Sequence, residues 1–74
     1  MDIKLGKYQH YKGKLYEVIG VARHSETLEE LVVYKSLYDS EEFGRGALWI
    51  RPKGMFIENV VDGDKEVSRF KFIE

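Results

Sequence analysis

The stretch Leu15-Tyr16-Glu17-Val18-Ile19-Gly20-Val21-Ala22-Arg23 decides the fold, because it predicts the longest strand of the chain. Strand alternation places Tyr16, Val18 and Ala22 on one face, and Leu15, Ile19 and Val21 on the other. Both faces are largely apolar, so we expect a central strand or one that curls around the corner of a barrel. Gly20, in its middle, predicts a bend or a bulge.

Shorter elements are predicted on both sides of this strand. Residues 7–11 form a strand before it, and residues 31–38 form a β-branched and aromatic strand after it. Between them, Thr27 and Glu30 have the spacing of a capping box, which predicts a single helical turn. Residues 39–46 are acidic and glycine-containing, and we expect a mobile loop there.

The C-terminal part continues the β pattern. Residues 47–51 predict a strand that ends at Pro52, and Asp62-Gly63 is a strong hairpin signal. In the closing segment, residues 66–73, Phe70 and Phe72 share one face. The sequence therefore predicts an all-β domain of five or six short antiparallel strands, a small SH3-like barrel, with an OB-like barrel as the alternative.

Length and composition predict one small domain spanning residues 1–74, and we expect a monomer. The chain has no cysteine, which excludes disulfides and cysteine-based metal clusters. The core must then rest on aromatic side chains, which make up 14% of the residues. We expect a cytoplasmic protein with no membrane partner, because no apolar run is long enough to span a bilayer and no signal-peptide core begins the chain.

Charge limits the range of partners. The net charge of −1 argues against a general polyanion binder, so nucleic acid would be at most a weak partner. The first 25 residues nevertheless hold five Lys and Arg against two acidic residues. Two oppositely charged surfaces explain this segregation, and a local anion site at the basic end is the alternative.

Several stretches together resemble a known family. They are Tyr8-Gln9-His10-Tyr11-Lys12-Gly13, the segment from Ala22-Arg23-His24-Ser25-Glu26-Thr27 to Val33-Tyr34, Leu48-Trp49-Ile50-Arg51-Pro52, and Met55-Phe56. This pattern resembles the bacterial domain of unknown function family 1653. The resemblance implies a short, stand-alone bacterial protein and implies no activity.

Catalytic and metal-binding patterns are missing from the sequence. His24 and Ser25 are adjacent, so on an extended chain they would point to opposite faces, and no nucleophile elbow surrounds Ser25. His10, His24 and Glu26 have no recognised metal-ligand spacing. We therefore predict no catalytic residue, no metal site and no cofactor.

A binding face is the remaining hypothesis. Trp49 and Arg51 share one face of their predicted strand, which a hairpin would bring near Tyr34. The predicted ligand-binding residues are Trp49, Arg51, Tyr34, Arg23, His24 and His10. An aromatic platform edged by arginine and histidine suits a peptide or a small anionic ligand. The competing interpretation is that Trp49 and Tyr34 are core and that Arg51 is a surface cap.

These observations favour a non-catalytic binding or interaction module that uses the face around Trp49. Two alternatives stay open. One is a small enzyme or ligand-processing accessory with His10, His24 and Arg51 in a cleft, and the other is a weak nucleic-acid binder. Histidine pKa values well away from about 6.5 would favour a functional pocket.

Overall fold

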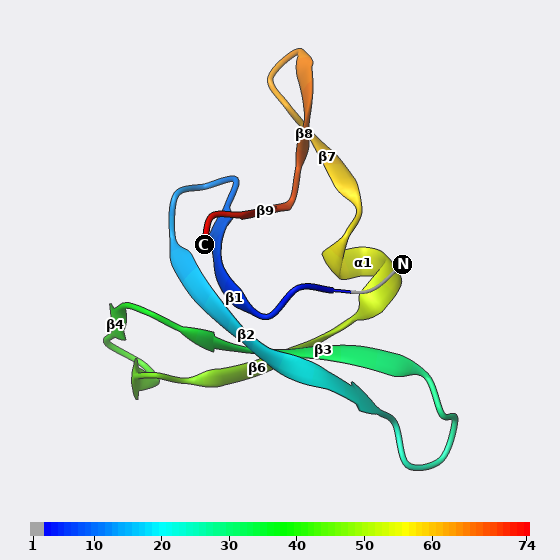
Figure 1. The fold of residues 1–74 in the computed structure, drawn as a ribbon. Helices are drawn as coiled ribbons and strands as arrows, with labels where there is room; N and C mark the ends of the chain where they lie inside the picture. The colour runs from blue at the N-terminus through cyan, green and yellow to red at the C-terminus, as the bar shows by residue number, and fades with distance from the viewer. Residues whose placement is uncertain (1–2) are drawn as a thin grey trace.

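The main sheet of the computed structural model, which describes residues 3–74, is built around β2 (Leu15–Arg23). Antiparallel neighbours flank it, β1 (Gly6–His10) on one side and β3 (Glu30–Ser36) on the other. Beyond these lie β6 (Leu48–Pro52), paired with β3, and β9 (Phe70–Phe72), paired with β1. The order is β6-β3-β2-β1-β9, and Figure 1 shows how strongly this sheet twists and curls.

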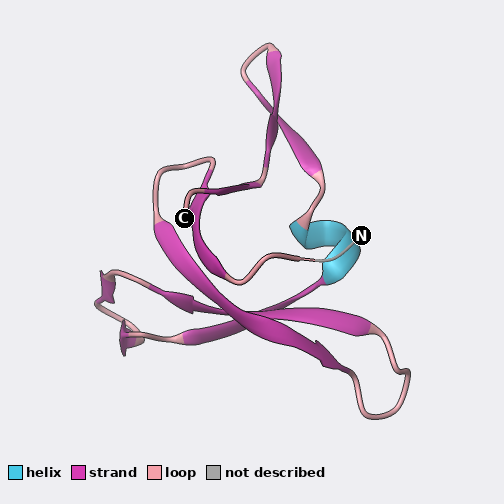
Figure 2. Cartoon of the chain, in the orientation of Figure 1, coloured by secondary structure: helices cyan, strands magenta, loops and turns pink. Residues whose placement is uncertain are grey.

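Short elements complete the chain. A two-residue ladder joins β4 (Asp39–Ser40) to β5 (Gly44–Arg45), and β7 (Asn59–Asp62) forms a hairpin with β8 (Lys65–Ser68). The one helical element within residues 3–74, α1 (Lys53–Phe56), links β6 to that hairpin (Figure 2). A small all-β fold of antiparallel strands is therefore confirmed. Within residues 3–74, β6 pairs only with β3 and β9 only with β1, so closure into an SH3-like or OB-like barrel stays a prediction.

The expected irregularity at Gly20 is present. The register of β2 against β3 shifts between Val18 and Gly20, so that one extra residue of β2 lies between two consecutive pairs. Val18 then pairs with Tyr34, and Val21 pairs with Val32. Val18 and Val21 consequently share a face. The prediction that Ala22 lies on the face of Val18 was wrong, because the bulge inverts the alternation behind it.

An aromatic core fills the concave side of the curled sheet. Phe56 of α1 stacks on Phe70 of β9 with ring centroids 4.2 Å apart and planes 7° apart. Their buried neighbours come from the three central strands: Tyr8, Val18, Val32 and Tyr34. Burial raises the pKa of Tyr8, whose hydroxyl donates to the Lys4 carbonyl. The expectation of an aromatic core is confirmed.

Two sequence-based expectations need correction. Residues 24–28 form a single turn, in which the backbone N–H of Leu28 donates to the His24 carbonyl at 2.8 Å, but the capping box is absent, because the hydroxyl of Thr27 accepts from the backbone N–H of Glu29 instead of capping a helix. The helical element is α1, directly after Pro52. Residues 39–46, expected as a loop, contain the β4–β5 ladder, whose connection returns through Gly44 at a φ of 75°. Within residues 3–74, the structure contains no helix with the length and apolar character of a membrane span.

Candidate ligand-binding site

The predicted face around Trp49 exists on the concave side of the sheet. Trp49 pairs with Tyr34, and Arg51 pairs with Val32. Since Tyr34 and Val32 are two residues apart on β3, all four side chains belong to one face. Trp49, Arg51 and Tyr34 thus share a face, as strand periodicity predicted.

Arg51 is partly buried and directed over the core. Its Nε donates to the hydroxyl of Tyr34 at 3.3 Å, and its Cζ lies 5.6 Å from the ring centroid of Phe70. No carboxylate of residues 3–74 pairs with it, and its two terminal nitrogens donate to no protein atom there. Neither nitrogen is among the buried unpartnered atoms, so both reach solvent. The two terminal nitrogens of the planar Arg51 guanidinium are therefore available to donate hydrogen bonds to a ligand.

Two tyrosine hydroxyls lie close to each other beside this arginine. The hydroxyls of Tyr16 and Tyr38 are 3.0 Å apart, and the ring of Tyr16 packs edge-on against Tyr34 at 5.4 Å. Burial and the hydrogen bond to Tyr38 raise the pKa of Tyr16, so its hydroxyl stays protonated at neutral pH. The hydrogen bond between Tyr16 and Tyr38 uses the proton of one hydroxyl. The other hydroxyl can therefore donate its proton to a ligand.

His10 joins the group from the end of β1. Its ring lies 5.0 Å from that of Phe70 and 6.4 Å from that of Tyr16, edge-on in both cases. The backbone N–H of Lys12 donates to His10 Nδ1 at 3.2 Å, so the neutral ring carries its proton on Nε2. Burial, followed by the charges of Arg51, Arg69 and Lys12, lowers the pKa of His10. At neutral pH His10 is therefore an uncharged N–H donor.

We call Arg51, Tyr34, Tyr16, Tyr38 and His10 the basic aromatic site. Sequence reasoning found Arg51, Tyr34 and His10, and it missed Tyr16 and Tyr38. Strand alternation placed Tyr16 on one face of β2, and the sheet's order was the information needed to connect that face to Arg51. Tyr38 was also within reach of the sequence, because alternation along the predicted strand of residues 31–38 places it on the face of Tyr34, although β3 ends at Ser36.

Trp49 takes a less open position than a binding platform requires. Its side chain packs against the core, and Phe43 meets it edge-on with ring centroids 5.4 Å apart and planes at 90°. The indole Nε1 is buried and has no hydrogen-bond partner within residues 3–74. Trp49 therefore lies at the rim of the core, covered in part by Phe43.

Arg23 and His24 form part of a turn. Arg23 Nη1 donates to the carbonyl of Leu28 at 3.0 Å, and His24 Nδ1 accepts the backbone N–H of Glu26 at 3.1 Å. Both side chains are exposed. His24 follows one end of β2 while His10 lies near the other, and the 9 residues of this strand span roughly 26 Å. The structure therefore does not bring His10 and His24 into one cleft with Arg51.

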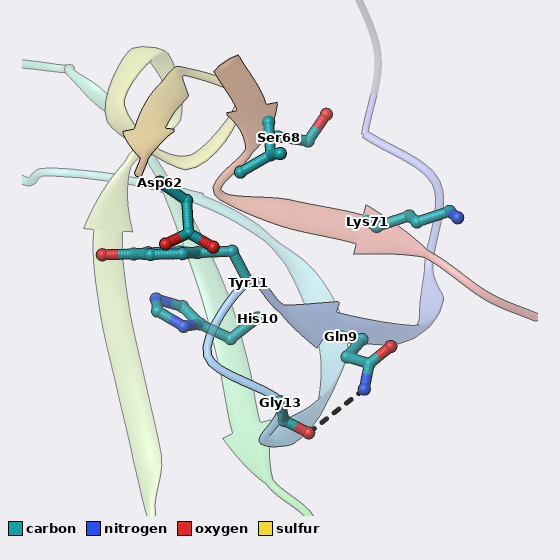
Figure 3. A pocket seen from close by; sticks show the side chains of 8 residues that line it. Gln9, His10, Tyr11, Gly13, Asp62, Ser68 and Lys71 are labelled. Carbon is teal, nitrogen blue, oxygen red and sulfur yellow. Dashed lines mark hydrogen bonds between the residues drawn. The ribbon is translucent and has the colours of Figure 1, made fainter. Parts of the chain in front are cut away.

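A hollow of about 450 Å³ lies beside His10, between the β1–β2 turn and the β7–β8 hairpin. In Figure 3 the rings of His10 and Tyr11 extend the same way, and Lys71 and Gln9 lie on the other side. The hollow is lined by Gln9, His10, Tyr11, Gly13, Asp62, Val67, Ser68 and Lys71. It combines an acidic and a basic side chain, so its charge is balanced, whereas that of the basic aromatic site is positive. Within residues 3–74, no three His, Asp or Glu side chains are grouped as metal ligands.

Comparison with known proteins identifies the family. Residues 6–72 match the family model described as "Protein of unknown function (DUF1653)". The chain is similar to the crystal structure of a protein of this family from Bordetella bronchiseptica, with 35% identity and a TM-score of 0.83 over 97% of this chain and 88% of the other. No curated protein matches. These matches confirm the resemblance seen in the sequence, and the chain belongs to the DUF1653 family.

Proposed function

We propose that this protein is a non-catalytic binding module that holds a small anionic ligand at the basic aromatic site. The observation that carries the proposal is Arg51, a partly buried arginine whose open donor fork meets no carboxylate of residues 3–74. An arginine fork fits a carboxylate or a phosphoryl group with two parallel hydrogen bonds. The bond to Tyr34 fixes the side chain before the ligand arrives, which lowers the entropic cost of binding.

The pattern of ion pairs supports an anion at this place. Five of the 12 Lys and Arg residues have an acidic partner within 4.0 Å: Lys7, Lys35, Arg45, Lys53 and Arg69. Three that do not are Arg51, Lys12 and Lys14, and all three contact rings of the same region. Lys14 Nζ lies 4.6 Å from the ring centroid of Tyr38. Three of the cations without an acidic partner within residues 3–74 thus contact aromatic side chains of this region.

The chemistry of the site supports binding without catalysis. The raised pKa of Tyr16 makes its hydroxyl a poor base, and the lone pair of His10 Nδ1 is occupied by the backbone N–H of Lys12. Both groups are hydrogen-bond donors that hold a ligand in place. A cytoplasmic location, expected from the sequence, is part of this proposal.

The test is a titration with two singly charged aromatic anions, phenyl sulfate and benzoate, and with benzylamine as a cationic control. Binding is followed by amide and ring-proton chemical shifts. We expect both anions to shift the resonances of His10, Tyr16 and Tyr34, and benzylamine to leave them unchanged. Arg51→Gln should weaken anion binding about tenfold, the value of one charge-assisted hydrogen bond.

Arg45→Gln is the matched control, because Arg45 is an exposed arginine paired with Asp39 at 3.4 Å. It should leave the affinity unchanged. Equal losses in the Arg51 and Arg45 variants, or shifts confined to the β2–β3 turn, would contradict the assignment of the site.

A further inference from the structure

We infer that the anion held at the basic aromatic site is a phosphomonoester, a group that carries two negative charges, and this inference rests on the proposed function. Carboxylates and sulfate esters carry one charge and phosphodiesters carry one per phosphate. The structure distinguishes these classes through the charge and the number of donors that surround His10.

The balance of charge near His10 is the first argument. Three cations act on its imidazole: Arg51, Arg69 and Lys12. Arg69 is neutralised by Glu58, whose Oε1 accepts from its Nη2 at 2.8 Å. Arg51 and Lys12 have no such partner within residues 3–74. A singly charged ligand would leave one of these two charges uncompensated, whereas a phosphomonoester at pH 8 compensates both.

The other charged groups around His10 leave this balance in place. Asp62 and Lys71 both line the hollow beside the imidazole, and their charges offset each other. Lys14, which lies over the ring of Tyr38, adds a further positive charge. Tyr16, whose ring faces His10 edge-on, is uncharged because burial and its hydrogen bond to Tyr38 raise its pKa. The surplus at the site is therefore at least two positive charges.

The number of available donors is the second argument. A phosphoryl group presents three strongly accepting oxygens. Arg51 offers its two terminal nitrogens, His10 offers Nε2–H, and the Tyr16–Tyr38 pair offers one hydroxyl proton. Arg51 belongs to β6, His10 to β1 and Tyr16 to β2, so the donors of the proposed phosphate site come from three strands. A flat carboxylate with two oxygens would leave part of this set unused.

The test compares phenyl phosphate with phenyl sulfate at pH 8, because the two share their shape and differ by one charge. We expect phenyl phosphate to bind about tenfold more tightly, the effect of one additional charge beside two partly screened cations. His10→Phe, which keeps a ring against Phe70 and removes an uncharged donor, should weaken the binding of both ligands and leave most of this preference. His10→Gln, which restores an N–H donor, should recover part of the lost affinity.

The outcomes separate this inference from the proposed function. If phenyl sulfate binds and phenyl phosphate binds no better, the site takes anions but the phosphomonoester assignment is wrong. If neither ligand binds, the phosphomonoester assignment and the proposed function are both wrong. A phosphotyrosine peptide provides a last comparison. An affinity well above that of phenyl phosphate supports a phosphorylated protein as the source of the group, and an equal affinity supports a small phosphate ester.

Discussion

Phe70 connects the core to the basic aromatic site, so its replacement tests the packing and the site together. The side chain is only 7% exposed. Its ring stacks on that of Phe56 with centroids 4.2 Å apart. Its centroid also lies 5.4 Å from that of Tyr34 and 5.0 Å from that of His10. The Cζ atom of Arg51 lies 5.6 Å from the same centroid. Phe70→Ala removes all of these contacts at once. It also opens a cavity between α1 and the sheet.

The expected loss follows from the burial of the ring. Truncating a buried phenylalanine to alanine costs about 3–5 kcal/mol. A domain of 74 residues has a total unfolding free energy of about 4–11 kcal/mol at ordinary values per residue. Phe70→Ala should therefore remove a large part of the stability. Urea unfolding, followed by Trp49 fluorescence and circular dichroism, measures the loss.

A milder variant separates packing from ring chemistry. Phe70→Leu keeps most of the apolar volume and loses the aromatic pairs and the cation–π contact, which predicts a loss of about 1–3 kcal/mol. Phe43→Ala is the control, since Phe43 is 58% exposed and has one aromatic partner, Trp49. It should cost about 1 kcal/mol or less. If Phe70→Ala lost no more than this control, the role assigned to Phe70 would be refuted.

Two further predictions concern pH and backbone. The lowered pKa of His10 means that the unfolded chain takes up its proton first as the pH falls below about 6.5. The stabilisation by neutral His10 is thus present above that pH and is lost as the pH falls through the folded pKa. Urea midpoints from pH 8 to 5 should fall less steeply in His10→Phe, and equal slopes would contradict this. Gly6→Ala should cost about 1–3 kcal/mol, because Gly6 has a φ of 134° and an added Cβ would lie 2.6 Å from the Glu74 carbonyl oxygen. In thermal melts Gly20→Ala, with nothing within 4 Å of the added Cβ, should show a clearly smaller loss than Gly6→Ala.

The strands were predictable because their information is local. Residues 15–23, 31–38 and 47–51 alternate between faces, and β2, β3 and β6 occupy closely similar ranges. The Asp62-Gly63 signal was also local, and the β7–β8 hairpin turns there. Each of these patterns depends only on neighbours within a few residues.

The helical turn at α1 was not predictable in the same way. Met55 and Phe56 have the apolar character of a strand, yet the chain turns there and Phe56 is only 1% exposed. Its burial against Phe70 of β9 is a tertiary contact. Tertiary packing overrides local preference at this position.

The approach of Arg51 to Phe70 could be predicted only from the arrangement of the strands in the sheet. Arg51 and Phe70 come from the two outer strands, β6 and β9, which are distant in sequence and unpaired with each other within residues 3–74. They meet because the sheet curls, so that Arg51 lies over the ring of Phe70. Strand periodicity could assign each residue a face, but it could not determine which outer strands would approach.

The two histidines show why residue type and local pattern do not locate a site. In each, Nδ1 accepts the backbone N–H two residues further on: Lys12 for His10 and Glu26 for His24. Locally the motifs are alike, and both follow or end a strand. The difference is tertiary, because Phe70 on β9 packs against the ring of His10 and the charge of Arg51 acts on it, whereas the ring of His24 stays exposed at its turn. The partner strand therefore decides which histidine faces charged and aromatic neighbours, and a binding role can be assigned only where those neighbours converge.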